Sequence, residues 1–255
     1  MDMRAEVWSP LQNSAVWLGA WLHGHEPADE LIDALTELGG YPEAYGSAAF
    51  SDILARLRAA TDALLGQGPG EPVLRLLLSG PGEPPALPAG STSAAAASAS
   101  PAGAIVVRTA DPSVHLVLVP HAGPNYTQWQ LIEETQPLPV PAWLSPGEAD
   151  ALLAQATEES ARIIEGLDYV KKDLPNPRLT VGTLSDFYDT PGLPDATPPR
   201  AAKLFARADR VAAIIETVTD RLQDHSLDPQ LLRLWRHIRQ ARMAGVAYAV
   251  ADFGR

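Results

Sequence analysis

The chain has no cysteine, only three lysines and no long apolar run, and each absence excludes a class of protein or site. Without cysteine, a disulfide scaffold, a thiolate zinc site and a cysteine nucleophile are excluded. A membrane-spanning helix needs a run of about 18 or more apolar residues, and the sequence contains none. Disorder is excluded as well, because 46% of the 255 residues are hydrophobic and only 20% are charged.

The motifs that mark common enzyme classes are also missing. The sequence contains no Walker loop, no GxGxxG pattern after a strand, and no HExxH, GxSxG or CxxC motif. A single sequence can hide an active site, so an enzyme stays open as an alternative. The absence of these motifs favours a protein without chemistry of its own, and no cofactor is expected.

What the chain does have is an uneven distribution of charge. Its 31 acidic and 19 basic residues give a net charge of −12, of which −10 falls in residues 1–140 and −2 in residues 141–255. Residues 196–255 alone carry a net charge of +4. Nucleic-acid binding needs clustered basic residues, so nucleic acid is not an expected partner of this acidic chain.

The first residues predict the compartment. Asp2 and Glu6 stand where a secretion signal needs a basic segment. The apolar stretch Ala15 to Leu22 is followed by histidine and glycine and not by a cleavage site. We therefore expect a cytoplasmic protein with no membrane partner.

Residues 1–140 predict an α+β domain. Three helical patterns precede residue 70, with apolar stripes, capping residues or terminal glycines. Short β-branched or aromatic runs bounded by Gly, Pro, Asp or Asn then predict roughly four strands in an antiparallel sheet. The predicted strands are Val73 to Leu78, Ala104 to Val107, Val114 to Val119 and Tyr126 to Ile132.

Residues 80–103, between the first two predicted strands, are rich in Pro, Ala and Ser. Leu87 is the one large apolar side chain in this stretch. A segment that can bury so little does not order itself. We therefore expect a flexible insertion on the surface.

Residues 141–255 predict a three-helix bundle with a long connection over residues 168–197. Ser145-Pro146-Gly147-Glu148 is a capping box, and Asp228-Pro229 caps the last helix. Three apolar stripes step by 4-3-4-3-4, the spacing of helices packed at a shallow angle. The stripes are Ala149, Leu153, Ala156, Ser160, Ile163 and Leu167; Leu204, Ala208, Val211, Ile215, Val218 and Leu222; and Leu231, Trp235, Ile238, Arg242, Gly245 and Ala249.

His23 and His25, followed by Glu26, Asp29 and Glu30, form the densest cluster of metal-ligand types. Two histidines two residues apart can chelate an ion when the backbone is extended. The alternative is a polar loop whose acidic residues face the N-terminus of the next helix. Because nothing fixes a third ligand, we expect no metal site.

Asp186, Tyr188 and Asp189 lie in the 168–197 connection, which far exceeds the usual length of about 2–8 residues between bundle helices. Carboxylates beside aromatic side chains can serve ligand binding or general acid–base catalysis. No histidine or nucleophile lies near them in sequence. The alternative is an irregular cover over the bundle.

The helix predicted after Pro229 has no acidic residue up to Ala251 and carries four arginines at steps of three. Arg233 and Arg236 lie opposite the apolar stripe, whereas Arg242 falls on it. An unpaired buried charge is very costly, so we predict that Arg242 pairs with a carboxylate from a facing element. These three arginines are candidate contacts to a protein partner or an anionic ligand.

Two functional hypotheses follow. The first is a cytoplasmic adaptor, chaperone or regulator that binds a protein partner or a second copy of itself, with Trp8, Trp17 and Trp21 expected to be exposed for this purpose. The rival is an enzyme or small-ligand binder that uses a cleft between sheet and bundle, covered by the 168–197 connection. A deep polar pocket under that connection would favour the rival, and an exposed apolar patch the first.

Overall fold

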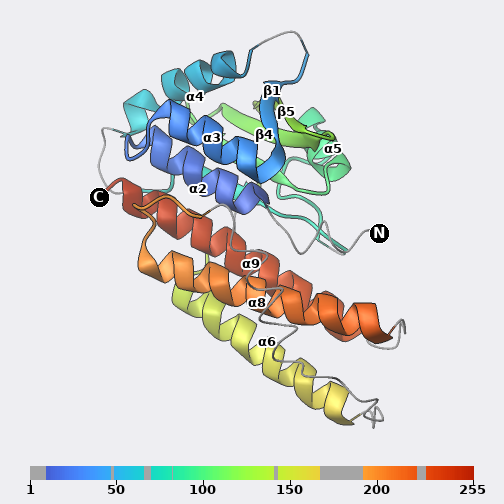
Figure 1. Ribbon diagram of the computed structural model, residues 1–255. Helices are drawn as coiled ribbons and strands as arrows, with labels where there is room; N and C mark the ends of the chain where they lie inside the picture. Colours follow the sequence, from blue (N-terminus) through green and yellow to red (C-terminus); the bar gives the residue numbers. More distant parts are fainter. Residues whose placement is uncertain are drawn as a thin grey trace.

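The computed structural model describes residues 10–46, 49–65, 70–81, 83–140, 143–166, 192–222 and 228–255. These residues form seven helices and five strands, with one sheet beside a long helical arm (Figure 1). None of the helices in the described ranges has the length and hydropathy needed to cross a bilayer. The helices are α2 (Pro10–Leu22), α3 (Ala28–Gly39), α4 (Phe50–Leu65), α5 (Thr92–Ala99), α6 (Pro146–Gly166), α8 (Pro199–Leu222) and α9 (Asp228–Phe253). The strands are β1 (Tyr41–Ala44), β2 (Leu74–Leu77), β3 (Ala104–Arg108), β4 (His115–Ala122) and β5 (Tyr126–Glu134).

The α+β class is confirmed, but the sheet differs from the four-stranded antiparallel sheet expected. Its strand order is β1-β5-β4-β3-β2, with β1 parallel to β5 and the other neighbours antiparallel. The missed strand, β1, has four residues and contains Pro42, so its local sequence carries little strand signal. Pairing with β5, with Tyr41 opposite Tyr126, holds it in the sheet.

One face of the sheet is covered by α2, α3, α4 and the last turns of α9. Alternate strand residues, such as Leu74 and Leu76 in β2, point into this first core. Because α2 contacts α3, α4, α9 and the sheet, it is buried almost all round. Trp21 is buried and Trp17 is half-buried, so their expected exposure is wrong; Trp8 lies outside the described residues.

The opposite face of the sheet carries α5, which lies inside the stretch 80–103 whose composition predicts flexibility. Ser91 caps this helix with its side chain. Leu87 and Ala97 pack with Val117 of β4 in a smaller second cluster. The composition misleads here because alanine is a strong helix former and its small side chain lets α5 lie close to the sheet.

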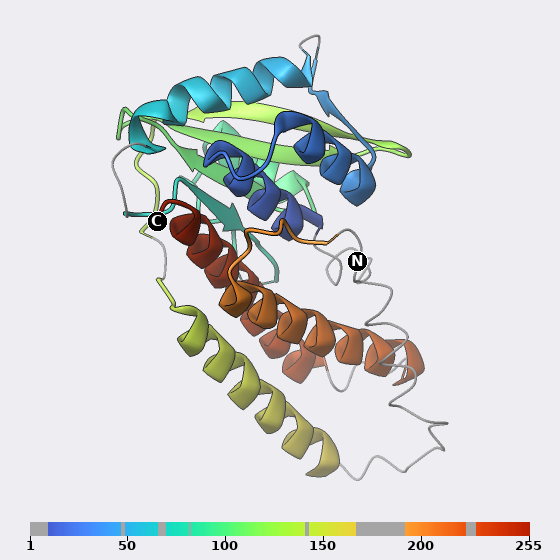
Figure 2. The same cartoon turned by 60° about the vertical axis from the view of Figure 1, so that its left-hand side comes forward.

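The helical arm consists of α6, α8 and α9 around a separate apolar core. At the start of α6 the capping box is present, because Ser145 and Glu148 each accept a hydrogen bond from the backbone N–H of the other. α9 continues past the arm, and its residues Val246, Val250 and Phe253 belong to the first core. The arm therefore differs from a self-contained bundle, since it shares α9 with the sheet (Figure 2).

Candidate functional site

The arginines of α9 connect this helix to both other helices of the arm. Arg233 Nη1 lies 3.2 Å from Glu159 Oε1 of α6. Arg242 Nη2 lies 2.6 Å from Asp209 Oδ1 of α8. Since Arg242 is buried, the predicted pairing with a carboxylate from a facing element is confirmed.

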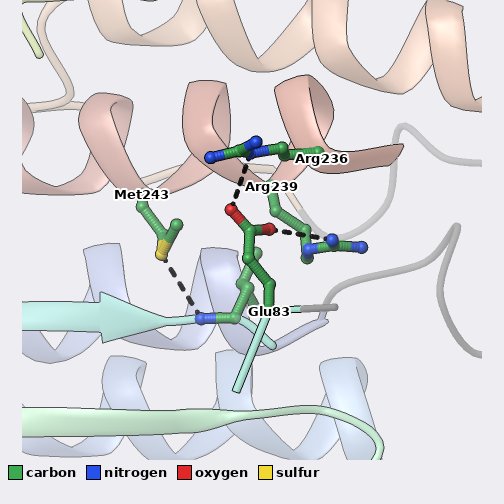
Figure 3. A network of polar contacts seen from close by, with 5 residues as sticks. Glu83, Arg236, Arg239 and Met243 are labelled. Carbon is green, nitrogen blue, oxygen red and sulfur yellow. Dashed lines mark hydrogen bonds and ion pairs between the residues drawn. The ribbon is translucent and has the colours of Figure 1, made fainter. Parts of the chain in front are cut away.

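A second contact joins α9 to the turn that follows β2 (Figure 3). Glu83 Oε1 lies 3.0 Å from Arg236 Nε, and Glu83 Oε2 lies 2.9 Å from Arg239 Nη2. We refer to Glu83, Arg236 and Arg239 as the Glu83 clasp. Two backbone hydrogen bonds between Gly80 and Glu83 close the turn. A Cβ on Gly80 would lie 2.3 Å from Arg239 Nη1, so the approach of this guanidinium depends on glycine there.

In these ion pairs, carboxylates of the same chain compensate the charges of four arginines of α9: Arg233, Arg236, Arg239 and Arg242. Beside the Glu83 clasp, the backbone N–H of Leu78 donates to Met243 Sδ at 3.4 Å, which links α9 to the end of β2 (Figure 3). Arg233, Arg236 and Arg242 thus make their contacts inside the chain. Their use toward a partner or ligand stays a prediction.

His23 and His25 lie at the end of α2, against the end of α9. His25 Nε2 is 2.9 Å from the carbonyl oxygen of Phe253, and His23 lines a cavity of about 150 Å³. Burial, with a smaller effect from His25, lowers the pKa of His23, so this ring is uncharged at neutral pH. Across the described ranges, no three His, Cys, Asp or Glu side chains come together as a metal site.

Asp186, Tyr188 and Asp189 lie outside the described residues. Of the connection 168–197, the structure describes residues 192–197. A cleft or cover formed by this connection therefore stays a prediction.

One end of the sheet presents an aromatic surface that the sequence reasoning missed. Tyr41 and Tyr45 are 60% and 58% exposed, and the ring of Tyr45 lies 5.5 Å from that of His121, centroid to centroid. Half-buried side chains of β4 and β5 continue this face. The set, named the tyrosine surface, is Tyr41, Tyr45, His121, Tyr126, Gln128 and Gln130.

The sequence signal for this surface is the alternation of Tyr41, Glu43 and Tyr45. All three are exposed, while Pro42 and Ala44 between them are buried. This period of two identifies an exposed strand face. This alternation can be recognised as a strand face only once β1 is known to pair with β5.

At the far end of the same face, three basic side chains and one acidic side chain form a row across four strands. We name Arg75, Arg108, His115 and Glu134 the basic row. In register, His115 lies opposite both Arg108 and Glu134, and Arg75 is a diagonal neighbour of Arg108. Burial is the largest cause of a lowered pKa at His115, and Arg75 and Arg108 lower it further. This ring is therefore uncharged at neutral pH.

The carboxylate of the row, Glu134, already has hydrogen-bond donors. Ser93 Oγ of α5 donates to Glu134 Oε2 at 2.5 Å, and the backbone N–H of Gln136 donates to Oε1 at 2.9 Å. Burial acts to raise the pKa of Glu134, but hydrogen bonds to the carboxylate outweigh it, and the pKa is lowered. Glu134 is thus ionised at neutral pH and holds α5 on the sheet.

Comparison with known proteins finds two matching family models. The one described as "Rv1486c-like protein, N-terminal domain" matches residues 12–143, and "Rv1486c-like protein, C-terminal domain" matches residues 147–243. The chain is 25% identical over 285 aligned positions to "Uncharacterized protein Rv1486c" of Mycobacterium tuberculosis strain H37Rv, which covers 94% of this chain and 96% of the relative. It is 26% identical over 289 positions to "Uncharacterized protein ML1804" of Mycobacterium leprae, with coverage of 94% and 97%. No solved structure matches the chain significantly.

Proposed function

The chain belongs to the Rv1486c-like protein family, and we propose that it is a cytoplasmic interaction protein, an adaptor, chaperone or regulator without chemistry of its own. The names of the two relatives state no activity, so the proposal depends on the surface of this chain. The tyrosine surface is the observation that carries it. The partner is a protein, or a second copy of the chain.

The composition of the tyrosine surface suits protein binding. Tyrosine offers a large rigid contact area at a low cost in conformational entropy, together with a hydroxyl group for hydrogen bonding. Beside Tyr41 and Tyr45, the amides of Gln128 and Gln130 can both donate and accept hydrogen bonds. Aromatic residues are enriched at interfaces and lysine, which is depleted there, is absent from this set, although Glu43, of another depleted type, is exposed between Tyr41 and Tyr45.

Binding through this surface uses side chains, because the backbone of β1 is protected against strand addition. The backbone N–H groups of Tyr41 and Tyr45 donate toward β5, so the alternate positions, Pro42 and Ala44, face the open edge, and only Ala44 has an N–H to offer there. Proline has no N–H, and Glu43 adds a charge to this four-residue strand. Natural sheets use such features to prevent edge-to-edge pairing.

Site-specific crosslinking in an extract of the native host tests the proposal. One protein carries a photo-reactive phenylalanine analogue at Tyr45, and the matched control carries it at Leu232, which is 44% exposed on α9. We expect one protein species to crosslink at position 45 and not at position 232. With that partner purified, the double variant Tyr41→Ala/Tyr45→Ala should bind about 30-fold more weakly, as expected for the loss of interface hot spots.

Two results would contradict the proposal. One is the same crosslinked species from both positions. The other is an unchanged affinity in a double variant whose circular dichroism matches that of the wild type. A crosslinked product of twice the chain mass identifies a second copy as the partner, and sizing of the free protein checks it.

The rival function, a small-ligand binder or enzyme between sheet and helices, is favoured by the cavity beside His23. This cavity of about 150 Å³ lies between the ends of α2, α4 and α9 and the start of β2. His23 Nε2 is shielded from solvent and has no hydrogen-bond partner among the described residues. Filling the cavity with Ala251→Trp should abolish the rise in Tm that a metabolite bound in this cavity produces in the wild type, whereas a rise caused by binding elsewhere should persist. A wild-type Tm that no mixture raises contradicts this function.

A further inference from the structure

The guanidinium of Arg75 lacks the carboxylate partner that the buried arginines of α9 have. Arg75 is half-buried on β2, and its Nε is shielded from solvent without a hydrogen-bond acceptor. The described residues offer this side chain no ion pair within 4 Å and no hydrogen bond. Because burying a charge without a partner is costly, the position calls for an anion from outside the described residues.

The charged residues described near Arg75 form no ion pair with its guanidinium. Glu71 pairs instead with Arg108, with Glu71 Oε2 3.5 Å from Arg108 Nε. Burial lowers the pKa of Arg75, Glu71 partly offsets this, and Arg108 lowers it again. Glu134, the one carboxylate of the basic row, accepts hydrogen bonds from Ser93 and from the backbone. Two like charges thus lie on adjacent strands with both nearby carboxylates already engaged.

His115, beside Arg75 and Arg108, contributes a polar atom that has no hydrogen-bond partner among the described residues. This atom, Nδ1, is shielded from solvent. The side chain lies opposite Arg108 across the β3–β4 ladder. An uncharged imidazole carries one N–H and can donate it to an anion.

Trp143 supplies an apolar wall at this end of the sheet. The centre of its ring system lies 6.0 Å from Cζ of Arg75, and the residue is 50% exposed. A half-exposed indole beside a guanidinium offers a flat surface to the carbon skeleton of a ligand. Tryptophan on the surface is otherwise an unfavourable exposure of apolar area.

We propose that Arg75, Arg108, His115 and Trp143 form a binding site for the carboxylate or phosphate group of a small organic anion. Arg75 binds the oxyanion through its planar fork of donors, which matches the oxygen spacing of both groups. Arg108 adds positive charge, His115 donates a hydrogen bond, and Trp143 contacts the carbon skeleton. The site is separate from the tyrosine surface, so either proposal can fail without the other.

Thermal unfolding at constant ionic strength tests the site with three probes: inorganic phosphate, acetate and benzoate, each balanced against chloride. We expect a saturable rise in Tm that reaches about 3 °C or more when the probe stands at ten times its Kd. The phosphate and carboxylate arms show which oxyanion the site prefers. If Trp143 contacts the ligand, benzoate binds more tightly than acetate, and Trp143→Ala removes that difference.

Arg75→Met is the decisive variant, and Arg210→Met is its matched control, because Arg210 is exposed on α8. We expect Arg75→Met to lose the response to the anions while Arg210→Met keeps it. Without anion, Arg75→Met should unfold at or above the wild-type Tm, because the substitution removes a half-buried charge. A merely structural arginine would instead lower the Tm when replaced.

Three results would overturn the proposal. They are an unchanged response in Arg75→Met, an equal loss of response in both variants, and an Arg75→Met protein that unfolds several degrees below the wild type in the absence of anion. If Arg75→Met does not fold, the wild type decides by NMR. Saturable shifts of the His115 ring signals with the preferred probe support the site, and unchanged signals refute it.

Discussion

Replacing Glu83 with glutamine removes the charge on which the Glu83 clasp depends and keeps a side chain of nearly the same size. In the wild type this carboxylate contacts Arg236 at 3.0 Å and Arg239 at 2.9 Å. The side chain of Arg239 is 9% exposed and that of Glu83 is 27% exposed. The variant therefore leaves a nearly buried guanidinium without its charged partner.

The size of the effect follows from these exposures. Breaking a buried ion pair from one side costs about 3–5 kcal/mol, whereas an exposed pair contributes about 0–1 kcal/mol. Because water reaches Glu83 and Arg236 is mostly exposed, we expect the free energy of unfolding to fall by about 2 kcal/mol. For a chain of this length, the Tm should fall by about 4–8 °C.

Urea unfolding measures the loss, and Glu133→Gln is the matched control. That variant breaks the Arg56–Glu133 pair, whose side chains are 52% and 50% exposed, and it should lose less than about 1 kcal/mol. The double variant Glu83→Gln/Arg239→Met should recover part of the loss, because the uncompensated charge is removed too. Equal losses in Glu83→Gln and Glu133→Gln would refute the claim that the burial of Arg239 makes the Glu83 clasp more stabilising than an exposed ion pair.

Gly245→Ala should lower the free energy of unfolding by about 1–3 kcal/mol, because the new Cβ would lie 2.4 Å from Cε1 of the buried Phe205. Urea titration checks this, and an unchanged midpoint contradicts it. Ser93→Ala should cost about 1–3 kcal/mol at neutral pH. Because a lowered pKa stabilises the fold above the unfolded pKa, this penalty should shrink as the pH falls through the folded pKa of Glu134; a constant penalty contradicts it. The lowered pKa of His23 means that the unfolded chain binds its proton more readily, so stability should fall as the pH drops below 6.5. The free energy of unfolding of His23→Gln should fall less steeply with decreasing pH than that of the wild type, and parallel curves would refute this.

Local sequence was enough to predict most of the helices and strands. The 4-3-4 apolar stripes, together with the caps at Ser145 and Asp228, located α6, α8 and α9, and the short β-branched runs located β2 to β5. The elements missed are those that depend on distant partners. β1 needs its ladder with β5, and Ser93 of α5 lies 41 residues before Glu134, to which it donates.

At the candidate sites, too, local sequence predicted what a single residue requires but not which distant residue supplies it. For Arg242, the cost of a buried charge predicted the kind of partner, but not which of the carboxylates it would be. Glu83 lies 153 and 156 residues before Arg236 and Arg239, in a stretch expected to be flexible, so the Glu83 clasp could not be predicted. The basic row is assembled from four strands, and strand order is a property of the whole sheet.

The sharing of α9 between two cores has a consequence for synthesis on the ribosome. His25 contacts the carbonyl oxygen of Phe253, 228 residues later in the chain. α2 and β2 therefore emerge long before the helix that covers them, and the first core stays open while the arm is translated. Contacts of such large sequence separation form slowly, and apolar surface exposed during that delay is prone to aggregation. The nascent chain is thus expected to depend on a general chaperone until α9 docks.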